Sequence, residues 1–405
     1  MTAPAASLAP GDHLLGHASP AFLGYWPEPG DDPKVSLGRE PVVVVTADRT
    51  IIRGIWWTPP AGTPWKTAVI LSHPRGDFSV HYACPMLAAA GYAVLGFSTR
   101  YDNNDIDCLH ESLVVDVEAA ALEARRRGAE SVVLLGNSGG GSLMALSQAE
   151  RPIGDGFIAL AAHPGEGVFM LQVLDPSVTD ETDPFSCDPE LDMYNPDNGW
   201  RPWPNPCTYD RAWLATYRGA QRDRCARIDA IANAALASRD TAAETMKGIA
   251  HDDLAREALK RRAVQGRYLV TYRTLADPAY LDLSIEPDER PMGTVFAFPD
   301  PYIGNYTYGG LARVMSARGW LSTWSGLSSH ARVADTIPKV TVPTIVVHAT
   351  ADTEIRMRQA KEIFDNSGAT DKTYVDVQGA DHYFRNGRRS DAMTTIIDWM
   401  RSRFP

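Results

Sequence analysis

The 405-residue sequence contains only five cysteines, an odd number, and none of them form a Cys-x-x-Cys spacing. Such a set predicts neither a disulfide framework nor a zinc site, so we expect free thiols. Basic runs are also absent, and the net charge of −11 is unfavourable for binding nucleic acids or anionic membranes. We therefore expect neither as a partner.

Long hydrophobic runs are absent too. No window reaches the length of a membrane span, and residues 1–8 lack the charged start and unbroken apolar stretch of a secretory signal, so we expect a cytoplasmic protein. The stretch from Asp192 to Gly199 spaces oxygen ligands but lacks the spacing and distal glutamate of an EF-hand. We expect no metal and no cofactor.

What the chain does have is 44% hydrophobic residues, enough for a large core in two domains or in one domain with a big insertion. Residues 42–47 and 51–58 predict a β-hairpin at a sheet edge. Strands that are apolar throughout then alternate with helical periodicity, which predicts an α/β fold with a mostly parallel central sheet flanked by helices. The strands are expected at 67–73, 92–97, from 131, 156–162, 344–349 and 373–377, and the helices at 82–90, 113–127, 139–149, 354–365 and 390–403.

Between residues 164 and 335 this alternation stops. A Pro-, Asp- and Trp-rich loop is followed by helical periodicity over 211–237 and 241–264. We predict a mainly helical lid, 164–335, inserted after the sixth strand of a core formed by 1–163 and 336–405. The lid is rich in aromatic residues, of which some are expected to form its core and others to line an apolar substrate pocket. They are Tyr194, Trp200, Trp203, Tyr209, Trp213, Tyr217, Tyr302, Tyr306, Tyr308, Trp320 and Trp324.

The apolar run from Ser131 ends on Gly-Asn-Ser-Gly-Gly, a Gly-x-Ser-x-Gly motif followed at once by a helix-forming stretch. This pattern is typical of a nucleophile elbow, in which a strained turn lifts the serine clear of the sheet. The helix from Gly139 directs its positive end and its free N–H groups toward charge that develops beside the hydroxyl. Ser138 is the candidate nucleophile.

A serine hydroxyl needs a base, and the base works best when a carboxylate orients it. His382 follows the last expected strand, and Asp352 follows the strand at 344–349, so both lie at carboxyl ends of strands. The resulting order is Ser, Asp, His. Asp376 and Asp381 are rival acids, but Asp376 lies within a strand and Asp381 is adjacent to the base.

With Ser138, Asp352 and His382 in these places, the chain resembles the α/β-hydrolase fold superfamily, in its serine-nucleophile, esterase-like branch, over 42–163 and 342–404. The resemblance implies two oxyanion donors, the amide of Gly139 and an amide in the loop after the 67–73 strand. That loop reads His-Pro-Arg-Gly, where the family often has His-Gly. The amide of Arg75 is the expected donor and that of Gly76 the alternative.

We expect a cofactor-independent serine hydrolase that cleaves an ester or lactone bond in a small apolar substrate. His163, Asn137, Tyr302 and Trp324 are the candidate pocket residues. The same machinery resembles that of carbon–carbon hydrolases of ring-fission products, and an acyltransferase or a non-catalytic binder would also keep the fold. The sequence does not separate the two hydrolase reactions, and it leaves a homodimer open.

Overall fold

The computed structural model describes residues 24–28, 31, 33–102, 104, 106–296, 298–307 and 310–405. Residues 1–8 and Tyr308, which entered the expectations above, lie outside these ranges. The strands and helices of the structure follow one another along the chain in the order β1 (Gly38–Val45), β2 (Ile51–Thr58), β3 (Thr67–Leu71), α1 (Ala83–Ala89), β4 (Ala93–Ser98), α2 (His110–Arg126), β5 (Ser131–Ser138), α3 (Gly139–Glu150), β6 (Gly156–Ala162), α4 (Glu166–Val173), α5 (Arg211–Lys247), α6 (Leu254–Ala263), β7 (Tyr268–Val270), α7 (Pro301–Gly304), β8 (Val314–Ser316), α8 (Ala317–Gly319), α9 (Val333–Thr336), β9 (Thr344–Ala349), α10 (Met357–Asn366), β10 (Lys372–Val377) and α11 (Arg388–Arg401). Short helical turns lie at Pro196–Asn198, Pro278–Tyr280, Trp320–Trp324 and Ile337–Lys339.

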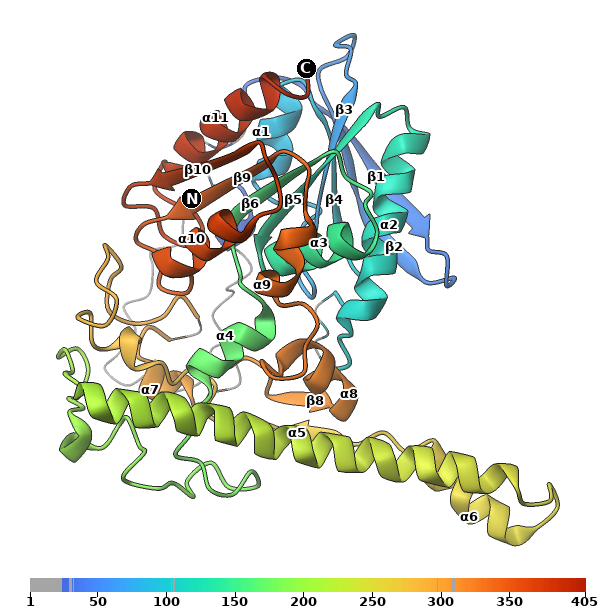
Figure 1. Cartoon of the computed structure of the whole chain (residues 1–405). Helices are drawn as coiled ribbons and strands as arrows, with labels where there is room; N and C mark the ends of the chain where they lie inside the picture. Colours follow the sequence, from blue (N-terminus) through green and yellow to red (C-terminus); the bar gives the residue numbers. More distant parts are fainter. Residues whose placement is uncertain are drawn as a thin grey trace, which may run out of the picture.

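One eight-stranded sheet forms the centre of the molecule, in the order β1-β2-β4-β3-β5-β6-β9-β10 (Figure 1). The expected edge hairpin is confirmed, since β1 pairs antiparallel with β2 and β2 antiparallel with β4. All other pairs in this sheet are parallel. The prediction of a mostly parallel sheet is therefore confirmed, and β5, which carries the serine motif, lies in its middle.

Helices cover both faces of this sheet, as strands that are apolar throughout require. On one face α1 and α11 pack onto the strands, through residues such as Leu87 and Ile396. On the other face lie α2, α3, α9 and α10, with Leu113, Leu143 and Ile363 among the contacts. Strands β3, β4, β6 and β9 are buried along their whole length, so the sheet is the rigid part of the molecule.

The region between β6 and β9 has its own apolar cluster, built around side chains such as Phe169, Tyr217 and Trp320. Its helices differ from expectation. The stretch predicted as two helices, 211–237 and 241–264, forms one 37-residue helix, α5, followed by the separate helix α6. The serine and polar residues at 238–241 are exposed or half-buried and continue the helix, and α4 was not predicted at all.

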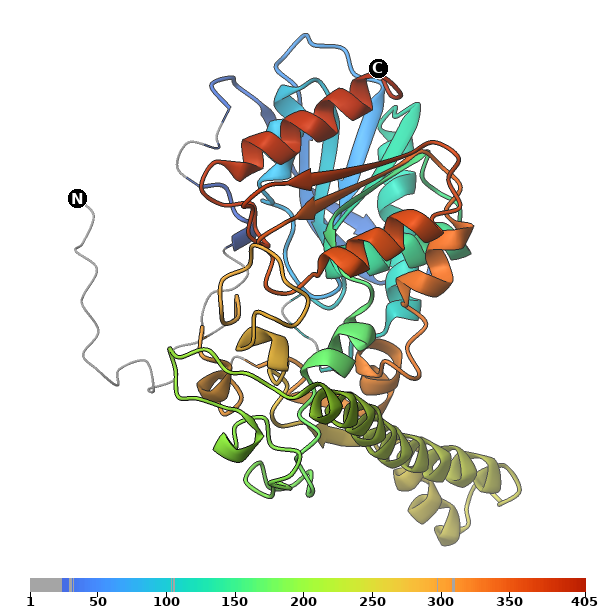
Figure 2. The ribbon, with the colours of Figure 1, turned by 60° about the vertical axis from the view of Figure 1, so that its left-hand side comes forward.

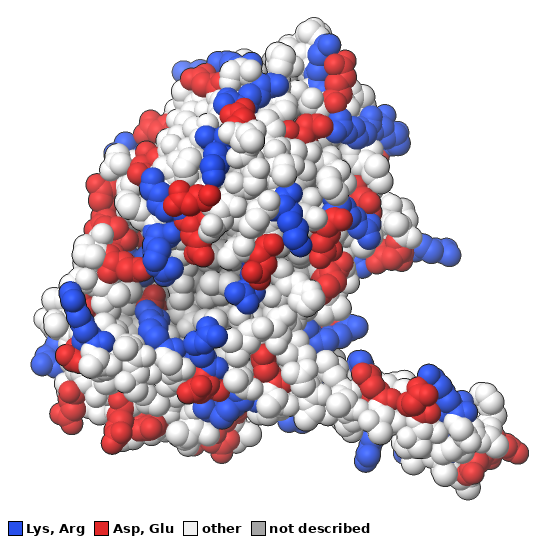
Figure 3. Space-filling model, in the orientation of Figure 1, with Lys and Arg blue, Asp and Glu red and all other residues white. Residues whose placement is uncertain are grey.

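The distal half of α5 projects from the body together with α6, as both ribbon views show (Figures 1 and 2). Acidic and basic side chains alternate on this arm and over the face in view in Figure 3, without a field of one sign. Within the described residues, no helix combines the length and the apolar character that crossing a bilayer requires. The five cysteines are all free, and Cys187 is the one that is half-buried.

Candidate active site

The Gly-x-Ser-x-Gly motif forms a sharp turn between β5 and α3. Ser138 has φ 54° and ψ −129°, a strained conformation for a residue with a side chain. Glycines make the turn possible: a Cβ on Gly136 would lie 2.6 Å from the carbonyl oxygen of Gly140, and one on Gly140 would lie 2.3 Å from that of Ser72. The geometry is that of a nucleophile elbow.

Three side chains far apart in the sequence meet at this turn. The Nε2 atom of His382 lies 3.0 Å from the Oγ atom of Ser138, and its Nδ1 atom lies 2.7 Å from Oδ2 of Asp352. The other Asp352 oxygen accepts the amide N–H groups of Glu354 and Ile355, at 2.7 and 3.1 Å. The carboxylate is therefore held from both sides, and Nδ1–H donates to it, which leaves Nε2 as the acceptor for the serine proton.

Burial disfavours the charged forms of Asp352 and His382, but the favourable contacts of these groups have a larger effect on their pKa values. Burial opposes ionisation of Asp352, but the imidazole of His382 and the two amides lower the pKa of the carboxyl below its ordinary value. Burial likewise disfavours a charged His382, yet Asp352 raises the pKa of the imidazole above 6.5. A histidine tuned in this way accepts a proton readily during a reaction near neutral pH.

The rival acids have other partners. Asp376 lies 2.9 Å from Nδ1 of His348 and accepts a hydrogen bond from Tyr374, also at 2.9 Å. Asp381 accepts from Nε of Arg385 at 2.6 Å. Neither carboxylate makes a hydrogen bond with His382, whereas Asp352 does.

The two expected oxyanion donors differ in their placement. Gly139 begins α3, so its N–H has no partner within the helix and lies beside Ser138. The amide of Arg75 instead donates to Nδ1 of His73 at 3.3 Å. This amide has a partner inside its own loop, and its role as the second donor stays a prediction. The Arg75 guanidinium lies 3.9 Å from Glu166 and over the ring of Trp324.

The pocket candidates fall into two groups. His163 is buried and lies 6.1 Å from His382 between ring centroids, so it lies near the relay. Trp324 is buried under Arg75. Burial lowers the pKa of His163 to about 3, which keeps the ring neutral, and its Nδ1 has no hydrogen-bond partner among the described residues.

The other two candidates are structural. Asn137 is fully buried, donates to the carbonyl of Leu160 at 2.7 Å and lies 2.9 Å from Nε2 of His81, so its amide is used inside the core. Tyr302 packs on Tyr194 and Trp200 within the inserted region. No contact within the described part of the chain joins Tyr302 to the relay, and the pocket role of Asn137 and Tyr302 stays a prediction.

Two further residues at the site were not anticipated. Tyr25 is buried, and its hydroxyl lies 3.3 Å from Nε2 of His382. Glu354 is buried behind Asp352 and accepts a hydrogen bond of 2.7 Å from Tyr280, a residue of the inserted region. Burial, opposed by the Tyr280 hydrogen bond and reinforced by Asp352, raises the pKa of Glu354 to about 7.

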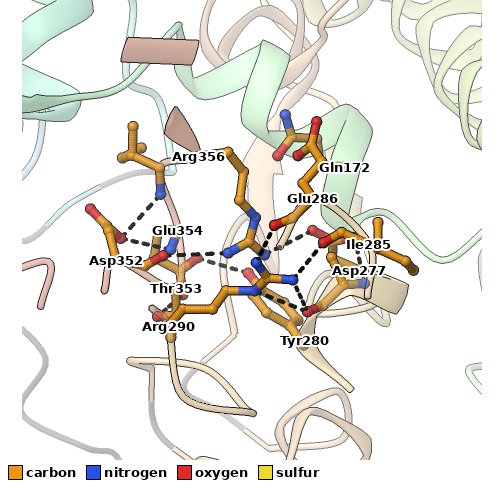
Figure 4. A network of polar contacts seen from close by, with 12 residues as sticks. Gln172, Asp277, Tyr280, Ile285, Glu286, Arg290, Asp352, Thr353, Glu354 and Arg356 are labelled. Carbon is orange, nitrogen blue, oxygen red and sulfur yellow. Dashed lines mark hydrogen bonds and ion pairs between the residues drawn. The ribbon is translucent and has the colours of Figure 1, made fainter. Parts of the chain in front are cut away.

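Figure 4 shows the network to which Glu354 belongs. Arg356, two residues further on, lies 3.5 Å from Asp277 of the inserted region, and the neighbouring Arg290 donates to the carbonyl of Ile285 at 2.6 Å. The loop that carries Asp352 is thus packed against the inserted region through buried charges. Within the described residues no cluster of three histidine, cysteine or acidic side chains could hold a metal ion.

Comparisons with known proteins were made by sequence and by structure. No family model and no curated protein matches the sequence. Among solved structures, an alpha/beta hydrolase, GrgF from Penicillium sp. sh18, aligns with a TM-score of 0.53 and 13% identity over 91% of this chain and 99% of that chain. Brefeldin A esterase, described as a bacterial homologue of human hormone sensitive lipase, aligns with a TM-score of 0.50 and 14% identity over 100% of this chain and 90% of that chain. At these identities the likeness shows a shared fold.

Proposed function

Since the chain has the α/β-hydrolase fold, we propose that it is a cofactor-independent serine hydrolase that cleaves an ester or lactone bond in a small apolar substrate. The observation that carries the proposal is the relay Ser138–His382–Asp352, with contacts of 3.0 and 2.7 Å. The fold is shared with brefeldin A esterase, whose name describes ester cleavage. The fold alone also hosts other chemistry, so the relay is the stronger support.

In the proposed reaction, Oγ of Ser138 attacks the carbonyl carbon while its proton passes to Nε2 of His382. Asp352 keeps the imidazole in the tautomer that accepts this proton and stabilises the imidazolium that forms. The amide of Gly139, at the positive end of α3, donates to the oxyanion. His382 then gives the proton to the leaving alcohol, and a water activated by the same nitrogen releases the acid from Ser138.

The surroundings of the relay favour a small and apolar substrate. Ser138 and His382 are only 5% and 3% exposed, which leaves little room for a large substrate to reach them. The aromatic side chains of Phe169 and Trp324 lie close by, Phe169 against the ring of His163 and Trp324 beneath Arg75. A site with such walls suits a small acyl or alcohol group better than a polymer.

The test is hydrolysis of p-nitrophenyl acetate and butyrate by the purified full chain, together with labelling by a fluorophosphonate. We expect turnover and labelling in the wild type and loss of both in Ser138→Ala. The matched control is Ser147→Ala, because Ser147 is also buried in α3 but donates to the carbonyl of Leu143. This variant is expected to keep the wild-type rate.

The same assay separates the competing reactions. Turnover of a ring-fission diketone with no turnover of any ester would replace the proposal by carbon–carbon bond hydrolysis. A transfer product that dominates over the free acid when an alcohol is added would replace it by acyl transfer. Absence of labelling at Ser138 in folded protein would contradict all three reactions and leave a non-catalytic binder.

A further inference from the structure

Tyr25 reaches the relay from the N-terminal segment. Its side chain is 4% exposed, and its hydroxyl lies 3.3 Å from Nε2 of His382, the nitrogen that lies 3.0 Å from Oγ of Ser138. The ring packs between the aromatic side chains of Phe78 and Tyr383, with centroids 5.0 and 4.9 Å away. A phenol is therefore held beside the imidazole nitrogen that contacts the candidate nucleophile.

A dedicated clamp fixes this position. The buried guanidinium of Arg389 donates to the carbonyl oxygens of Gly24 and Trp26, at 2.5 and 2.8 Å, on either side of Tyr25. The carbonyl of Tyr25 itself accepts the amide of Tyr82 at 2.8 Å. Three backbone carbonyls in a row are thus bound, which removes the freedom of the segment and preorganises the hydroxyl.

Close packing against Tyr383 also explains why a glycine precedes Tyr25. A Cβ on Gly24 would lie 2.6 Å from ring atoms of Tyr383, so the backbone approaches that ring more closely than any other residue would allow. Arg389 also pairs with Asp31 at 2.5 Å, which compensates its buried charge.

The Tyr25 hydroxyl carries a proton that it can donate to an oxygen formed beside Ser138. Nε2 of His382 accepts the proton of Ser138, because its Nδ1–H is donated to Asp352. The phenol proton is therefore not needed for the relay itself. Burial, with further contributions from Tyr383 and Asp352, raises the pKa of Tyr25 well above 10, so the phenol keeps its proton at neutral pH.

The oxyanion site needs such a donor. The amide of Arg75 donates to His73, so the loop after β3 does not present it to the substrate. Of the two expected donors, only the amide of Gly139 remains beside Ser138. Removal of one oxyanion donor slows acyl transfer by about 100- to 1,000-fold, so a site with a single donor would be a poor catalyst.

We propose that the Tyr25 hydroxyl is the second donor of the oxyanion hole, opposite the amide of Gly139. The inference rests on the proposed ester hydrolysis. When Oγ bonds to the carbonyl carbon, the carbonyl π electrons move to its oxygen and the serine proton moves to His382. The phenol keeps its proton and donates a hydrogen bond to the new oxyanion.

The test compares Tyr25→Phe with the wild type on p-nitrophenyl butyrate and ethyl butyrate. We expect kcat to fall about 100- to 1,000-fold on both esters, with KM changed less than threefold. The affinity for a trifluoromethyl ketone, whose adduct carries an oxyanion, should fall by a similar factor. The control is Tyr82→Phe. This neighbouring tyrosine is fully buried and its hydroxyl has no partner among the described residues, so the Tyr82→Phe variant should keep the wild-type activity.

The outcomes are distinct. A Tyr25→Phe rate within threefold of the wild type overturns the inference and favours the amide of Gly76 as the second donor. A loss confined to ethyl butyrate also overturns it, because p-nitrophenolate leaves without a proton and the phenol would then act on the leaving group. If the wild type cleaves no ester, the proposed function itself fails.

A second variant separates chemistry from folding. Tyr25→Ala leaves a ring-sized cavity beside His382, and we expect added phenol to restore part of its rate while toluene does not. Equal rescue by toluene would show that the ring acts only by packing and would overturn the inference.

Discussion

The sheet and the inserted region hold together by different means. Strands β3, β4, β6 and β9 are buried along their whole length and bind each other by regular backbone ladders. The inserted region has a short two-stranded sheet and long irregular segments, and buried arginines join these segments. Arg224 and Arg273, both nearly inaccessible, bind Glu181, Asp175 and neighbouring carbonyls.

The sheet positions the groups of the relay, whereas contacts from the inserted region act on those groups. The groups of the relay all belong to turns at the carboxyl edge of the sheet, where strand ends bring them together. Glu354, which acts on the relay electrostatically, lies in the same turn as Asp352 but is bound by Tyr280 of the inserted region. A substitution in the relay should therefore affect chemistry alone, whereas one in the inserted region should affect structure first.

The largest effect is expected for a substitution in the relay, which tests whether the groups at the edge of the sheet affect chemistry alone. Asp352→Asn keeps the shape of the side chain but favours the wrong tautomer of His382, so kcat should fall by about 10⁴-fold. The unfolding midpoint should change little beside this loss. The rate is measured on p-nitrophenyl butyrate and the midpoint by urea titration. Asp376→Asn, the rival acid, serves as control, and an equal loss of rate there would refute the assignment.

The next largest effect is expected for a substitution in the inserted region, which tests whether buried arginines hold that region together. Arg273 pairs with Asp175 and Asp192 at 2.7 and 2.8 Å, and Arg273→Met leaves the fully buried Asp175 without this cation. Breaking such a pair from one side costs about 3–5 kcal/mol of unfolding free energy. Hydrogen exchange should rise in peptides from the inserted region before it rises in β3 to β6.

The control for this substitution is Arg318→Met. Arg318 is half exposed and pairs with Asp107 at the surface, a type of contact worth about 0–1 kcal/mol. If both variants lose the same stability, or if the central strands exchange as early as the inserted region, the two regions are not held together differently.

The same contrast explains which parts of the fold and of the candidate site could be predicted from the sequence. The strands, the elbow and the order of Ser138, Asp352 and His382 were predictable because each depends on a local pattern: an apolar run, a glycine spacing, a polar residue just after a strand. Boundaries shifted by a few residues at most in these elements, as with the helix expected at 354–365 and observed at Met357–Asn366. The meeting of the three groups then follows from parallel strand order.

The inserted region offered no such pattern. The prediction left a break at residues 238–240, between the stretches expected at 211–237 and 241–264, yet these polar residues continue α5 without ending it. Tyr302 was assigned to the pocket from aromatic content alone, which does not distinguish a lid core from a cavity wall.

Tyr25 shows the limit most clearly. It lies in a Pro/Gly-rich leader, and its position depends on Arg389, more than 360 residues away in the sequence. No local periodicity or spacing records a contact over that separation. The engaged amide of Arg75 was hidden for a related reason, because only the folded loop brings Nδ1 of His73 within reach.

The smallest expected effect concerns the link between the two regions. Ionised Glu354 raises the pKa of His382, and Glu354 itself titrates near 7. Because only neutral His382 accepts the serine proton, kcat/KM should rise with pH through the pKa of His382, on an acid limb above pH 6.5. Glu354→Gln removes the negative charge, lowers that pKa and should move the limb to lower pH. The pH profile of p-nitrophenyl butyrate hydrolysis measures the shift, with the exposed Glu362→Gln as control. A limb that stays in place would mean that the buried carboxyl remains protonated throughout, and that the inserted region supports the catalytic loop without tuning it.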